Sequence, residues 1–200
     1  MNKPDIFIGF EQGIPSNIIY DFKENIKTEG LNVIVESRMP TGMMACLEWY
    51  MLPAVAVFIG KSYFDGFLKE MGKEHYQSMK EHLSNFTNNV MKTPKIEPTL
   101  LGTPGKISTK NPFSSAFSIF ADAENELKFK LLIPKHTTEI DYFLITNKFI
   151  DFLANYHSGL QTLQSIGYDI NEPRPTSNII FVHYNTEKKS IEWLNANEYR

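Results

Sequence analysis

Side chains that suit a small anionic ligand follow each of three short apolar segments near the start of the chain. Phe10 and Glu11 follow the first segment, Arg38 follows the second, and Ser62 and Tyr63 follow the third. If the segments are parallel strands, these residues share one edge of the sheet, where helix N-termini and loop amides of open α/β sheets bind ligands. We therefore predict a ligand site there. The same group includes Pro40, Gly42 and Lys61.

Each of these residues also has an ordinary structural interpretation. Arg38 could pair with a surface acid, and Tyr63 could belong to the core. Only their shared position favours a ligand site over these structural roles.

Other sequence patterns with known chemistry are missing. The five histidines do not have metal-ligand spacing, so we expect no metal site. The loop at 102–109 has the wrong glycine spacing for a phosphate-binding loop, and the chain has no Gly-x-Ser-x-Gly elbow. The single cysteine, Cys46, lies among apolar residues and is expected to be a buried, inert thiol.

The elements that would position the ligand residues can be read from periodicity. Apolar runs at 6–10, 31–35 and 54–59 predict strands, and helical spacing predicts helices from residue 17 to about residue 29 and at 43–52. Two successive strand-helix-strand units imply right-handed crossovers in one parallel sheet. A long helical pattern follows at 63–90, with Gly72 as a possible break.

The pattern changes after a Pro/Gly-rich stretch. Alternating residues predict a hairpin around the turn at 122–126, then a helix from 140 to about 159, then a hairpin over 179–194. The predicted organisation is an α/β half at 1–92, a connector at 93–112 and a hairpin-helix-hairpin half at 113–200. Whether the second half packs on the same sheet stays open.

Composition limits the class of protein. The chain has 200 residues, 42% of them hydrophobic, and a formal net charge of -3. This charge gives no overall positive field for nucleic acid, so we expect none as a partner. The segment 39–60 is long enough to cross a membrane, but Glu48 and Pro53 favour a buried helix and strand over a membrane span. The short apolar run after the N-terminus predicts no signal peptide, and we expect a cytoplasmic protein.

Three motifs together resemble the TIR (Toll/interleukin-1 receptor-like) domain family over roughly the first 90 residues. The run 5–10, Asp-Ile-Phe-Ile-Gly-Phe, is similar to the family's opening strand. Glu36-Ser37-Arg38 with Pro40 and Gly42 is similar to its acidic-basic Pro-Gly loop, and 55–63 is similar to its third strand and the Ser-x-x-Tyr after it. The resemblance implies a TIR/flavodoxin-like parallel sheet in the first half.

The resemblance also implies an activity. Enzymatic TIR domains cleave the nicotinamide-ribose bond of NAD with a glutamate on the helix after the third strand, which here makes Glu70 and Glu74 the catalytic candidates. Phe10, Glu11, Arg38, Ser62 and Tyr63 would then bind the nucleotide. The main alternative is a non-catalytic protein-interaction module that assembles through its α/β half, as a homo-oligomer or with a protein partner. A flavodoxin-like domain that binds another small anion is a third possibility.

Overall fold

The structure is a computed structural model that describes residues 3–40, 50–93, 111–171 and 173–195, apart from the side chains of 67, 70, 71 and 176. Its strands are β1 (Ile6–Glu11), β2 (Val33–Arg38), β3 (Val55–Ile59), β4 (Phe113–Asp122), β5 (Lys128–Pro134), β6 (Ile179–Asn185) and β7 (Ser190–Trp193). Its α-helices are α1 (Ser16–Ile26), α2 (Leu68–Met91) and α3 (Tyr142–His157), with a π-helix η2 (Tyr63–Phe67) before α2. Short 3-10 turns are η3 (Glu124–Glu126), η4 (Gln164–Ile166) and η5 (Thr176–Asn178).

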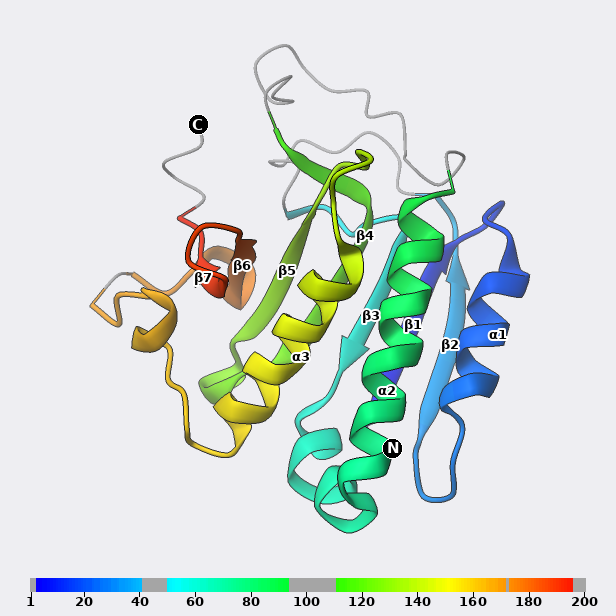
Figure 1. Cartoon of the computed structure of the whole chain (residues 1–200), viewed down its shortest axis with the longest axis horizontal. Helices are drawn as coiled ribbons and strands as arrows, with labels where there is room; N and C mark the ends of the chain where they lie inside the picture. Colours follow the sequence, from blue (N-terminus) through cyan, green and yellow to red (C-terminus); the bar gives the residue numbers. More distant parts are fainter. Residues whose placement is uncertain (1–2, 41–49, 94–110, 172, 196–200) are drawn as a thin grey trace.

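The described strands form one mixed sheet in the order β2-β1-β3-β4-β5-β6-β7. The pairs β1/β2, β3/β4 and β5/β6 are parallel, and their connections contain α1, α2 and α3, respectively. The pairs between these units, and β6/β7, are antiparallel. Figure 1 shows all three helices on the same face of the sheet, so the fold is a two-layer α/β arrangement.

The predicted parallel order of the first three strands is wrong at β3, which runs antiparallel to β1. β3 begins at the same end of the sheet at which β2 ends, so the two strands run in opposite directions. There the Arg38 guanidinium donates to the carbonyl oxygen of Pro53 at 2.6 Å, and Glu11 N–H donates to Ala54. A strand that is buried on both faces has the same apolar sequence pattern in either direction, so the pattern of β3 could not reveal this. The helix predicted at 43–52 falls largely outside the described residues.

Several other predictions are confirmed. The β4/β5 and β6/β7 hairpins have the predicted positions, although the β4/β5 register shifts between Phe113 and Ser118. The first strand-helix-strand unit is present, and α2 breaks at Gly72. Because β3 pairs with β4, the two halves of the chain share one sheet.

The core lies between the sheet and the helices. Phe22 of α1 stacks on Phe86 of α2 with ring centroids 4.4 Å apart, and Phe117 of β4 meets Phe86 edge-on at 5.6 Å. Phe129 of β5 contacts Phe152 of α3 in the same edge-on manner at 5.1 Å. These aromatic contacts connect α1 to α2, and α2 and α3 to the strands behind them.

The other face of the sheet carries a smaller apolar cluster. It contains Phe113, Leu132, Phe181 and Leu194, with Tyr50 and Ile179 packed against it. Among the described residues, no helix is both long and apolar enough to cross a membrane.

Candidate functional site

The residues that were predicted to share one ligand-binding edge lie at two opposite ends of the sheet. Phe10, Glu11 and Arg38 end the parallel strands β1 and β2. Ser62 and Tyr63 follow β3, which runs the other way, so they lie beside the start of β1. The prediction of a single edge is therefore wrong, because it depended on the direction of β3.

Internal contacts occupy the first end. Arg38 pairs with Glu11 at 3.0 Å and donates to the backbone carbonyls of Pro53 and Leu52. Phe10 is only 5% exposed and belongs to the core, so its ring cannot stack on a ligand without repacking. Pro40 is exposed, and Gly42 lies outside the described residues. Here the structural interpretation of Arg38, as the partner of an acid, is confirmed.

The second end holds a polar network. The Ser62 hydroxyl donates to Asp5 Oδ1 at 2.5 Å, and the Lys61 N–H donates to Asp122 Oδ2 at 3.1 Å. The Lys61 ammonium also lies 3.4 Å from Asp65. Tyr63 is fully buried in the core, as its structural interpretation stated. Ser62 and Lys61 are exposed and stay accessible to a ligand.

The backbone after Ser62 is irregular in two places. Residues 63–67 form a π-helix, and π-helical turns occur frequently at functional sites. Five residues later Gly72 interrupts α2 with φ 75° and ψ -166°, a conformation that is essentially restricted to glycine. Glycine adopts this conformation without strain, whereas any other residue would be strained there. We call residues 60–76 the β3–α2 junction.

Two histidines at this junction are held towards their neutral form. The His157 ring, from the end of α3, stacks on Phe64 at 4.7 Å, and its Nε2 atom is buried without a hydrogen-bond partner among the described residues. Burial lowers the pKa of His157, although the nearby Asp65 acts in the opposite direction. Burial also lowers the pKa of His75, whose ring lies 6.0 Å from that of Tyr63. Both imidazoles are therefore mostly uncharged at neutral pH.

A charged contact fixes α2 against α3 next to these histidines. Asp151 accepts from the Tyr76 hydroxyl and from the Lys80 ammonium, each at 2.7 Å. Burial, followed by the hydrogen bond to Asp151, raises the pKa of Tyr76. This contact is structural, because it holds the part of α2 after Gly72 in a fixed position.

The two catalytic candidates lie on either side of the break at Gly72. Glu70 is in α2, and its side chain is outside the described part of the structure, whereas Glu74 is exposed. Sequence reasoning identified Gly72 as a possible break, but it considered the histidines only as metal ligands and gave no role to His75 or His157. For His157 no local signal exists, because α3 brings it to the junction from far along the chain.

Comparison with protein-family models, with curated proteins and with solved structures finds no match for this chain. No group of three or more His, Cys, Asp or Glu side chains that could hold a metal ion occurs among the residues that the structure describes. Function is therefore inferred from the side chains of the junction themselves.

Proposed function

We propose that this chain binds a nucleotide such as NAD at the β3–α2 junction and cleaves its nicotinamide-ribose bond. The observation that carries this proposal is the glycine-only conformation of Gly72, which lies between Glu70 and Glu74. Glycine adopts this conformation without strain and so allows α2 to break between the two glutamates. The junction adds exposed polar groups at Lys61 and Ser62.

The proposed chemistry needs few groups. When the bond between the ribose carbon and the nicotinamide nitrogen breaks, its electron pair leaves with nicotinamide and positive charge builds on the ribose. A carboxylate from Glu70 or Glu74 would stabilise this charge. Water then adds to the ribose carbon, and its proton passes to a nearby base, for which the half-buried His75 is suited. The products are nicotinamide, ADP-ribose and a proton.

The resemblance to TIR domains supports this proposal through one shared arrangement. In both cases a helix that follows the third strand carries a glutamate, and here α2 follows β3 directly after η2. The antiparallel β3 departs from the parallel sheet that the resemblance implies. A TIR-like or flavodoxin-like origin of the first 90 or so residues is therefore part of the proposal.

The test is release of nicotinamide from NAD by the purified protein at high concentration, followed by chromatography. We expect release by the unmodified chain and a large loss in Glu70→Gln or Glu74→Gln, whichever carries the reaction. Glu81→Gln is the control, because Glu81 is an exposed glutamate further along the same helix. No release from the unmodified chain, or equal release from all variants, would refute the proposal.

A second candidate function is assembly with another copy of the chain through the opposite end of the sheet. The observation that favours it is a pair of exposed apolar side chains, Met39 at 76% and Leu52 at 54%. Met39 follows Arg38 in the chain, and Leu52 supplies a carbonyl oxygen to which the Arg38 guanidinium donates. Exposed apolar side chains on a backbone that hydrogen bonds hold in place suit a protein contact.

Sedimentation over a range of protein concentrations tests this second function. We expect concentration-dependent association that Met39→Ser and Leu52→Ser weaken. Leu160→Ser is the matched control, since Leu160 is 78% exposed in the loop after α3. A strict monomer at every concentration, or an equal effect of Leu160→Ser, would exclude this function.

A further inference from the structure

A row of three phenylalanines crosses the sheet face that the helices leave uncovered. Phe7 of β1, Phe58 of β3 and Phe120 of β4 are direct cross-strand partners. Neighbours in such a register have Cβ atoms about 5 Å apart, so the three rings form one continuous strip. Their chain neighbours Ile6, Ile8, Val57 and Ile119 are buried in the core on the helix side.

One end of the row is covered and the other is not. Phe120 is only 9% exposed, and Lys130, whose ammonium lies 5.3 Å from the centre of the Phe120 ring, donates to the Met51 carbonyl at 2.7 Å. Phe7 and Phe58 stay partly exposed. The Phe7 ring leans over Gly9, because a Cβ atom at position 9 would lie 3.1 Å from Phe7 Cε1. The accessible part of the row is thus the pair Phe7 and Phe58.

An exposed lysine, Lys128, lies over one ring of this pair, that of Phe58. The Lys128 ammonium lies 5.3 Å from the centre of the Phe58 ring. Its direct cross-strand partner is Asp122, yet the two form no ion pair among the described contacts. Asp122 instead accepts from the Lys61 N–H. A cation is therefore positioned at the Phe58 ring, next to the cross-strand partner Phe7, where it can meet an anionic group.

We propose that Phe7, Phe58 and Lys128 form a binding site for a purine mononucleotide. The base stacks on the two rings, and the phosphate pairs with the Lys128 ammonium. Two rings match the size of one base, and a single exposed lysine with a net charge of -3 suits one phosphate better than a nucleic acid strand. Binding here needs neither Glu70 nor Glu74, so this inference goes beyond the proposed function.

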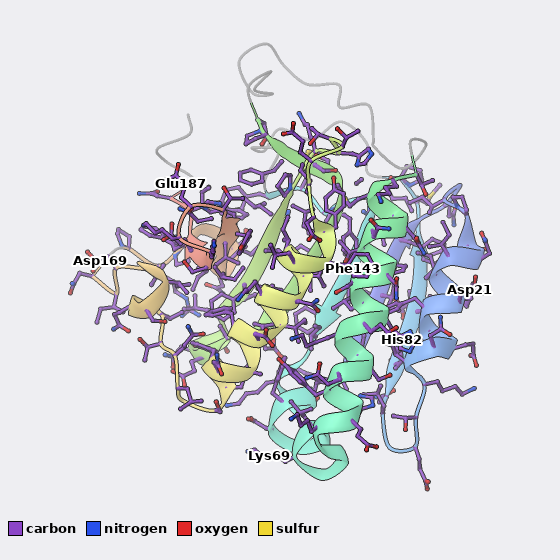
Figure 2. The ribbon with its side chains drawn as sticks, in the orientation of Figure 1. Asp21, Lys69, His82, Phe143, Asp169 and Glu187 are labelled. Carbon is purple, nitrogen blue, oxygen red and sulfur yellow. The ribbon has the colours of Figure 1, made fainter. Side chains whose placement is uncertain are left out.

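The experiment is a titration of the isotope-labelled protein with adenosine 5′-monophosphate, followed by amide chemical shifts. We expect saturable shifts on β1 and β3, and about tenfold weaker binding by Phe58→Leu, which removes one stacking ring. Lys128→Gln should weaken binding and reduce its dependence on salt. The control variants are Phe143→Leu and Lys148→Gln on α3, in the helical layer where Figure 2 labels Phe143.

Two partial ligands separate the contributions of base and phosphate. Adenosine should bind equally to the unmodified chain and to Lys128→Gln, and ribose 5-phosphate should bind to neither. No saturable shifts at millimolar nucleotide, or Phe58→Leu binding as tightly as Phe143→Leu, would overturn the proposal. A Glu74→Gln variant that no longer cleaves NAD should still bind the mononucleotide here, so failure of one proposal is distinguishable from failure of the other.

Discussion

Replacing Gly72 by alanine should destabilise the protein through backbone strain alone. Gly72 has φ 75° and ψ -166°, and a Cβ atom built there meets no other atom within 4 Å. A clash therefore contributes nothing to the cost. An alanine must either adopt a conformation that is essentially restricted to glycine or straighten the helix, which would pull residues 60–71 away from their contacts.

The magnitude follows from two opposing effects. Holding a non-glycine residue in this region costs about 1–3 kcal/mol. Alanine also reduces the conformational freedom of the unfolded chain, which stabilises the folded protein by roughly 0.4–1 kcal/mol. We expect a net loss of about 1–2 kcal/mol in the free energy of unfolding by urea. For a chain of this size, that loss lowers the melting temperature by roughly 2–8 °C.

Gly66→Ala is the matched control for this prediction. Gly66 is exposed in the π-helix, also has no atom within 4 Å of a built Cβ, and lacks a positive φ. Alanine there should be neutral or slightly stabilising. If Gly72→Ala proves as stable as Gly66→Ala, the break does not require a glycine-only conformation at position 72, and the argument that places the candidate site at the junction fails.

Three further predictions concern stability. Gly60→Ala should cost about 1–3 kcal/mol in a thermal melt, because its Cβ atom would lie 2.9 Å from the Pro4 carbonyl oxygen, which is backbone; an unchanged melt would contradict this. Asp151→Ala should cost about 1–3 kcal/mol in urea unfolding, since Lys80 keeps its charge and loses its acceptor, and adding Lys80→Met should recover part of the loss. Burial lowers the pKa of His157 below its ordinary 6.5, so the unfolded chain binds a proton there more readily than the folded chain. The contribution of His157 to the free energy of unfolding should be fully present above pH 6.5 and be lost as the pH falls through the folded pKa. Urea titrations at a series of pH values should show that His157→Gln makes this loss smaller.

The sequence predicted those elements whose pattern depends on local spacing. The helical repeat of Ile18, Ile19, Phe22 and Ile26 predicted α1, and alternation on both sides of 122–126 predicted the β4/β5 hairpin. Gly72 was predicted as a break because glycine is unfavourable inside a helix. The candidate site was predicted only in part, because its ligand residues were assigned to one edge from an assumed strand direction.

The sequence by itself determined the positions of most helices and strands, the two C-terminal hairpins and the absence of a strong overall positive charge. The tertiary structure alone decided the direction of β3, since an apolar strand that is buried on both faces reads the same in either direction. It also decided which polar groups meet at the junction. His157, Asp122 and Asp5 arrive there from distant parts of the chain, through pairings that no local pattern encodes.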